Sequence, residues 1–169
     1  MPPFRPVLQV FRLFPFLSLL AAGLCLGCSG QSAKHLPCAR WESIAPQTVR
    51  MRHLLFRYQV VPVGDEVGVM AEASPRPDRL PDWAAWYGEI GLDIYITDEN
   101  GTVLARQGVT LPPRSLDPEA ALPVQARFNL GTNAGRPLFV AFGYRLILAD
   151  APPDAATRKI LVAEGALER

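Results

Sequence analysis

Apolar and polar side chains alternate along several stretches of this chain, which is the pattern of a β-strand with one buried face. The clearest case is residues 89–97, where Ile90, Leu92, Ile94 and Ile96 share one face and polar residues occupy the other. The same period of two predicts further strands over residues 53–61, 67–73 and 123–130.

Segments rich in turn-forming residues separate these predicted strands. Pro62 to Glu66 connect the strands at 53–61 and 67–73, so the two are expected to form a hairpin. The sequence DENG at 98–101 predicts a second turn, because Gly101 can adopt a positive φ angle. Residues 102–109 would then return as the partner of strand 89–97.

The whole pattern predicts an all-β fold. Residues 137–149 are apolar on both faces in their first half, as in a central strand. The tail at 155–167 fits either a strand or a short helix. Six to seven strands with frequent turns predict an antiparallel β-sandwich, and the layout resembles an immunoglobulin-like sandwich. We assign residues 41–169 to one such domain.

The first 27 residues have a different character. Residues 1–12 carry Arg5 and Arg12 without an acidic residue, and residues 13–27 are apolar and uncharged. An apolar run of this length is shorter than the roughly 20 residues that span a bilayer. A positive start followed by a short apolar core is typical of an export signal.

Two cysteines close this segment, and the residues before them distinguish their roles. Small Gly27 precedes Cys28, whereas bulky Leu24 precedes Cys25, and signal cleavage favours small residues. The stretch Cys25 to Cys28 resembles the lipobox of bacterial lipoproteins. The resemblance implies that residues 1–27 are a signal peptide and that Cys28 carries a diacylglycerol. The alternative is an ordinary secretory signal that leaves Cys28 free.

The resemblance also implies a location for the protein. A lipid on Cys28 would attach the chain to a membrane of the bacterial envelope, with the folded part in the periplasm. Ser29, in place of Asp, favours the outer membrane by analogy with well-studied Gram-negative bacteria. The small polar residues that follow predict a flexible tether over 28–40. Cys38 would have no cysteine partner in the mature chain and is expected to be a buried, inert thiol.

Composition narrows the function further. The 169 residues are 49% hydrophobic and 20% charged, which is typical of a globular protein. Because 17 basic residues face 16 acidic ones, the formal net charge is only +1, which argues against nucleic acid as a partner. The 17 prolines favour short strands and stiff loops over helices.

No familiar catalytic or metal-binding pattern emerges from the sequence. His35 and Cys38 supply two of the four ligands that a closed zinc site needs. Asp98 and Asn100 match only the interior of a calcium-binding loop, and no serine lies in a nucleophile elbow. We therefore predict a non-enzymatic protein that needs neither a metal nor a cofactor.

One aromatic segment, DWAAWYG at 82–88, is the candidate binding surface. Trp83, Trp86 and Tyr87 follow a proline-rich loop that carries Arg76 and Arg79. Rigid aromatic side chains at the end of a sandwich are suited to contact a partner, although they can also cap the core. We therefore predict an interaction or assembly module with an envelope protein as partner. The alternative is a binding protein for glycan, peptide or lipid that uses the same loop.

Overall fold

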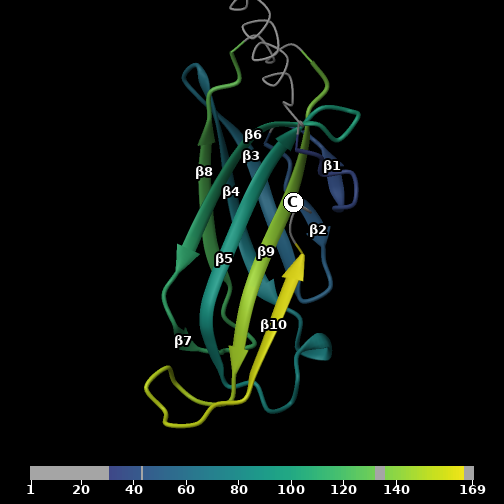
Figure 1. The fold of residues 1–169 in the computed structure, drawn as a ribbon. Helices are drawn as coiled ribbons and strands as arrows, with labels where there is room; N and C mark the ends of the chain where they lie inside the picture. The colour runs from purple at the N-terminus through teal and green to yellow at the C-terminus, as the bar shows by residue number, and fades with distance from the viewer. Residues whose placement is uncertain (1–30, 43, 132–135, 166–169) are drawn as a thin grey trace, which may run out of the picture. The chain divides into compact units, whose positions relative to one another are not determined.

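The computed structural model describes residues 31–42, 44–131 and 136–165. This part of the chain is all-β, and two antiparallel sheets pack on each other as a sandwich (Figure 1). The six-stranded sheet consists of β1 (Cys38–Arg40), β5 (Trp86–Thr97), β6 (Val103–Leu111), β7 (Arg114–Ser115), β9 (Phe139–Ala149) and β10 (Ile160–Gly165). The four-stranded sheet consists of β2 (Gln47–Arg50), β3 (Leu54–Val63), β4 (Glu66–Pro75) and β8 (Leu122–Phe128).

The ten strands in the described residues exceed the six to seven expected from the sequence. The three unpredicted strands, β1, β2 and β7, have only three, four and two residues, too few to display a period of two. The ambiguous tail forms strand β10, not a helix. A short 3-10 helix, η1 (Pro77–Arg79), follows β4.

The predicted hairpin and central strand are both confirmed. β3 and β4 pair along their whole length, with Val60 opposite Val69. β9 pairs with β5 on one side, and on the other side with β1 and β10, which lie end to end along its edge. β9 is therefore a central strand, and the consecutive residues 140–144 are all buried, so both faces of its first half are covered.

The core lies between the two sheets and is centred on aromatic side chains. Phe56 of β3 stacks on Phe142 of β9, with ring centroids 4.4 Å apart and an interplanar angle of 15°. Tyr58 meets the same Phe142 ring edge-on at 5.1 Å. Because these contacts join residues from different sheets, they fix the face-to-face packing of the sandwich.

The predicted turn at 98–101 is also confirmed. Gly101 adopts a φ of +75°, and the Asp98 side chain accepts hydrogen bonds from the backbone N–H groups of Asn100 and Thr102. These hydrogen bonds lower the pKa of the Asp98 carboxyl, since they favour its charged form. A turn residue therefore accounts for the acidic motif that partly resembled a calcium loop.

The tether expected over 28–40 is instead part of the sandwich from Gln31 onward. Ser32 forms a bridge with Thr102, and the Ala33 N–H donates a 2.8 Å hydrogen bond to the Gly101 carbonyl. Ala33 and Leu36 are buried, and β1 pairs with β9. Ala33 and Leu36 stand singly among mostly polar residues, so residues 31–37 show no periodic pattern that would predict their packing on the sheet.

This N-terminal segment crosses the outer face of the six-stranded sheet. At Ser32 the segment pairs with Thr102, which directly precedes β6, and at Cys38 it pairs with the far edge of β9. Strand β5 lies between β6 and β9, so the segment passes over it. Tyr95 of β5 lies on that outer face but is only 1% exposed. It belongs to the same apolar cluster as Ala33 and Leu36, so the crossing segment explains its burial.

The proposed signal peptide and Cys28 lie outside the described residues. Within the described part of the chain, no helix is both long and apolar enough to cross a membrane.

Candidate functional site

The aromatic residues predicted as a binding surface are divided by the structure. Tyr87 is 2% exposed and belongs to the core, so it is not available to a ligand. Burial and the nearby Asp117 carboxylate raise the pKa of Tyr87 to about 12. Its hydroxyl finds no hydrogen-bond partner among the described residues, so its role is packing and the candidate surface loses one of its three aromatic members.

Trp83 and Trp86 remain half-buried at one end of the sandwich. The ammonium of Lys159 lies 4.4 Å from the centroid of the Trp83 ring, in a cation–π contact. The Ala85 N–H donates to the Ala149 carbonyl, and the Leu116 N–H donates to the Ala85 carbonyl. These contacts join the three loops at this end, which span 76–85, 112–121 and 150–159. We call this group of loops the end surface.

The two predicted arginines differ in their surroundings. Arg79 is exposed at the end surface and lies 3.2 Å from Asp78. The Arg76 side chain is only 17% exposed, and its guanidinium donates hydrogen bonds to the Met51 carbonyl at 3.0 Å and to Asp78 at 2.9 Å. Arg76 therefore holds the turn before β3 in place, and it faces a groove that the sequence did not indicate.

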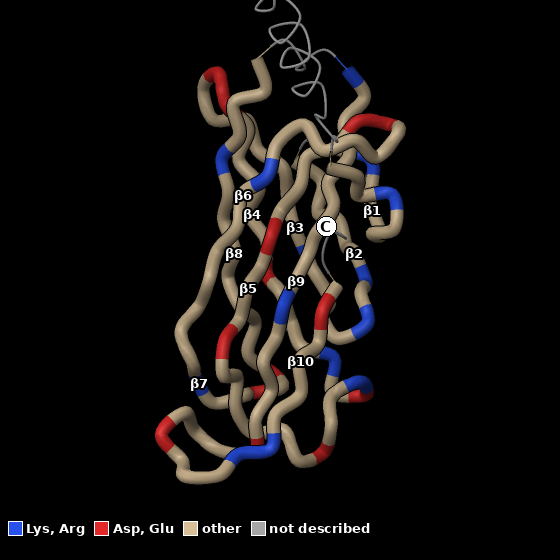
Figure 2. The backbone as a smooth tube through the Cα atoms, in the orientation of Figure 1, with Lys and Arg blue, Asp and Glu red and all other residues tan. Residues whose placement is uncertain are grey.

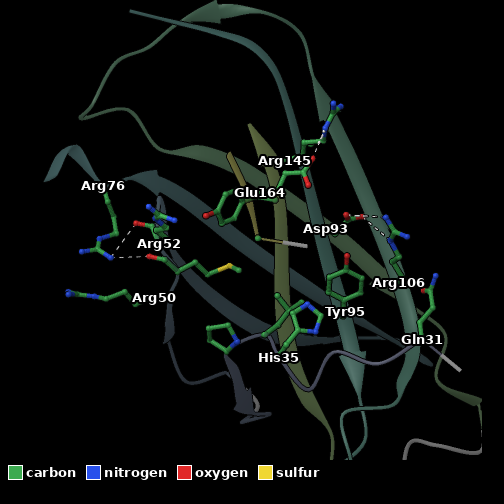
Figure 3. A pocket seen from close by; sticks show the side chains of 16 residues that line it. Gln31, His35, Arg50, Arg52, Arg76, Asp93, Tyr95, Arg106, Arg145 and Glu164 are labelled. Carbon is green, nitrogen blue, oxygen red and sulfur yellow. Dashed lines mark hydrogen bonds and ion pairs between the residues drawn. The ribbon is translucent and has the colours of Figure 1, made fainter. Parts of the chain in front are cut away.

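This groove has a volume of about 1240 Å³ (Figure 3). It lies where β1 and β10 leave a gap along β9, because Ala141 pairs with β1 and Tyr144 with β10. Five arginines and two acidic residues line it together with His35, Tyr95 and Tyr144. The charged members are Arg50, Arg52, Arg76, Arg106, Arg145, Asp93 and Glu164.

Both acidic residues of the groove are already paired. Arg106 donates two hydrogen bonds to the Asp93 carboxylate, at 3.0 and 3.1 Å, and this contact raises the pKa of Arg106. Arg145 donates to Glu164 at 3.0 Å. We call this hollow the arginine groove, since its five arginines outnumber its two carboxylates.

Arg50 and Arg52 form no ion pair with any residue that the structure describes. In Figure 3 they lie on the same wall as Arg76, opposite Asp93 and Arg106. Unpaired guanidinium groups gathered on one wall of a hollow suit an anionic group with several oxygen acceptors. The wider surface is balanced, and Figure 2 shows acidic and basic residues interspersed at both ends of the sandwich.

A buried polar pair adjoins this wall, and one of its members, Tyr144, lines the groove. Nδ1 of His53 and the hydroxyl of Tyr144 share a hydrogen bond of 2.8 Å, and both residues are buried. Burial lowers the pKa of His53, and the positive charges of Arg52 and Arg76 lower it further. These surroundings favour the neutral form of His53, which suits a structural hydrogen bond to Tyr144 next to the arginine groove.

His35 and Cys38, two residue types that can bind zinc, do not form a larger ligand set. Among the described residues, no group of three or more histidine, cysteine or acidic side chains is placed to hold a metal ion. Cys38 is an exposed free thiol, not the buried one that the sequence suggested. Cys38 is the first residue of β1 at the sheet edge. In this strand Ala39 is half-buried, whereas Cys38 and Arg40 are exposed.

Comparison of the chain with protein-family models, curated proteins and solved structures finds no match.

Proposed function

We propose that this protein is a lipid-anchored, non-enzymatic interaction or assembly module of the bacterial envelope, with its sandwich in the periplasm and its lipid on Cys28. The outer membrane is the favoured attachment site, and another envelope protein is the expected partner. Two residues separate Cys28 from Gln31, whose carbonyl accepts a hydrogen bond from the Val103 N–H of β6. A chain of that length reaches at most about 11 Å, so the lipid would hold the domain close to the membrane.

The observation that carries this proposal is the placement of the end surface. The chain joins the sandwich beside the turn at 98–101, which follows the last residue of β5, whereas the end surface adjoins Trp86, its first residue. A strand of 12 residues is roughly 36 Å long. Anchoring at one end of the sandwich therefore leaves Trp83, Trp86 and Arg79 uncovered at the other.

The sheet arrangement supports an immunoglobulin-like sandwich as part of this proposal, because both sheets are antiparallel and packed face to face. Such sandwiches commonly use their end loops for recognition while the sheets provide a rigid support. The burial of Tyr87 favours protein contact by the two tryptophans over a stacking platform of three aromatic side chains for glycan, peptide or lipid.

Crosslinking in intact cells tests the proposal. The expected result is one envelope protein recovered repeatedly with the wild-type chain and lost in the Trp83→Ala, Trp86→Ala double variant. Met70→Ala is the matched control, because Met70 is 51% exposed on the four-stranded sheet, away from the end surface. Recovery of the same partner from the double variant would refute the assignment of the end surface.

The anchor has its own test. Cys28→Ser should leave the precursor without lipid and uncleaved. We expect the precursor's mass to retain residues 1–27, and the protein to lose acyl-chain labelling. A wild-type mature mass and envelope distribution in the Cys28→Ser variant would refute the lipoprotein assignment.

The arginine groove favours a second candidate function, binding of a small anionic ligand. Arg50 and Arg52 together carry two positive charges that no described carboxylate neutralises, which matches a phosphate monoester at neutral pH. Titration with inorganic phosphate should shift the backbone amide resonances of these two residues. An Arg50→Gln, Arg52→Gln variant should show no such shift, and equal responses from both proteins would exclude this site.

A further inference from the structure

Strand β10 is an exposed edge of the six-stranded sheet (Figure 1). Among the described residues it pairs only with β9. Ile160, Leu161 and Val162 are consecutive, and their exposures are 50%, 38% and 48%. Natural edge strands are commonly protected by proline, a bulge or an inward-pointing charge. The ladder of β10 runs from Ile160 to Gly165 without proline or register shift, so its backbone is available to another strand.

The hydrogen-bond pattern shows which residues face the open edge. The Asp150 N–H donates to the Lys159 carbonyl, so Lys159 directs its backbone groups toward β9. Hydrogen-bonded and non-hydrogen-bonded pairs alternate along an antiparallel ladder. Ile160, Val162 and Glu164 therefore direct their N–H and C=O groups away from β9. They form the row to which a further strand would bind.

The sequence of this edge is complementary to itself. When two copies of residues 158–164 are placed antiparallel about Leu161, Arg158 lies opposite Glu164, and Ile160 lies opposite Val162. Leu161 then meets its own counterpart on the two-fold axis. On the outer face, which carries residues 158, 160, 162 and 164, the facing pairs are therefore either apolar with apolar or positive with negative, and both kinds stabilise a sheet. On the inner face Lys159 lies opposite Ala163.

The neighbouring registers lack this agreement. The side-chain faces of a continuous sheet match only when the register changes by an even number of residues. Centring the pair on Val162 places Ile160 opposite Glu164, and centring it on Ile160 places Arg158 opposite Val162. Either shift sets a charge against an apolar residue on the outer face, where the register about Leu161 has none. Glu164 already accepts a hydrogen bond from Arg145 on the outer face, and Arg158 of a second copy would join that ion pair.

We propose that β10 is the docking surface for a second copy of this chain, which pairs antiparallel to it about Leu161 and extends the six-stranded sheet across a two-fold axis. The interaction uses residues 158–164 and requires neither the lipid on Cys28 nor the end surface. A ladder of this length is a small interface, so a covalent trap is a better readout than an equilibrium mass.

Disulfide trapping tests the proposal in cells that express the full chain. In the predicted register Leu161 occupies a non-hydrogen-bonded pair, where opposite Cα atoms lie about 4.5 Å apart, within the range of a disulfide. Leu161→Cys, in a Cys38→Ser background to remove the exposed thiol, should give a band of twice the chain mass after mild oxidation. We expect at least ten times more of this band than from the control Met70→Cys in the same background.

The register is tested by mixing two differently tagged chains. Ile160→Cys in one and Val162→Cys in the other should crosslink to each other more than either does to itself. Adding Val162→Lys to the Leu161→Cys chain should abolish the dimer band, because the introduced ammonium group would face Ile160 of the second copy. Because these side chains are partly exposed, the variants are expected to fold.

Three results would overturn the proposal. The first is a Leu161→Cys dimer band no stronger than that of Met70→Cys. The second is a Leu161→Cys adduct with a different protein, which would make β10 a docking strand for another partner. The third is self-crosslinking of Ile160→Cys that equals the mixed pair, which would exclude the register centred on Leu161.

Discussion

Gly101 connects the turn at 98–101 to the N-terminal segment, so an alanine at this position has two separable effects. The φ of +75° is a left-handed conformation that disfavours a side chain. An added Cβ would also lie 2.7 Å from Cγ and 3.2 Å from the backbone nitrogen of Lys34. The N-terminal segment would have to move away, although the Ala33 N–H currently donates to the Gly101 carbonyl.

A matched control separates the two effects. Gly64 has a similar φ of +63°, but an added Cβ there would meet no atom within 4 Å. Gly64→Ala should therefore reduce the free energy of unfolding only by the conformational cost, about 1–2 kcal/mol. Gly101→Ala should add the loss of one hydrogen bond, about 1 kcal/mol, and part of the burial of Ala33 and Leu36. The expected total is about 2–4 kcal/mol.

Urea unfolding followed by tryptophan fluorescence measures these losses, and limited trypsin digestion localises them. Lys34 is exposed, and cleavage after it requires the N-terminal segment to detach from the sheet. We expect faster cleavage at Lys34 in Gly101→Ala than in wild type, and a wild-type rate in Gly64→Ala. Equal stability losses and equal cleavage rates in the two variants would refute the docking of this segment against the turn.

Two further predictions concern the core and the buried histidine. Phe142→Ala should reduce the free energy of unfolding by about 3–5 kcal/mol, because the fully buried ring stacks on Phe56 across the two sheets; a loss below about 1 kcal/mol would contradict that packing. His53 has a pKa below its ordinary value of 6.5, through burial and the charges of Arg52 and Arg76. The unfolded state therefore binds the proton more tightly, so this contribution to stability is complete above pH 6.5 and is lost as the pH falls through the folded-state pKa. As the pH is lowered below 6.5, the urea midpoint of the wild-type protein should decrease, and that of His53→Asn should decrease less.

The larger part of the fold follows from local pattern. The period of two in 53–61 and 89–97 corresponds to β3 and β5, and the apolar character of 137–149 corresponds to central β9. These predictions succeed because a strand with one buried face must alternate, whatever its partners are. Short β1, by contrast, is defined by its pairing with β9, which local sequence does not encode.

The candidate sites were harder to predict because they depend on long-range placement. Tyr87 and Trp86 are neighbours in the sequence, yet only Tyr87 points into the core, since successive strand residues face opposite sides. The arginine groove joins Arg52 from the turn before β3 with Asp93 of β5, on the other sheet. Its paired and unpaired arginines look alike in the sequence, and only the fold shows which have carboxylate partners.

The proposed anchor and the proposed dimer together constrain the orientation of the protein. A two-fold axis normal to the six-stranded sheet reverses the strand direction. The N-terminal segments therefore enter the two sandwiches at opposite ends of the dimer. Both Cys28 lipids then reach one membrane when the axis is parallel to the membrane normal and the sheet lies along the surface. The N-terminal segment crosses the outer face of that sheet, so this face would be nearer the lipid.

That orientation determines where a partner is found. In the dimer the end surface, with Trp83 and Trp86, points along the membrane plane and meets proteins attached to the same membrane. A single sandwich held by one lipid can instead stand upright and direct the same loops across the periplasm. If Leu161→Cys traps a dimer, we therefore expect the protein crosslinked through the end surface to be membrane-attached. A soluble periplasmic partner recovered together with that dimer would show that one of the two geometries is wrong, and the Cys28→Ser and register tests would identify which.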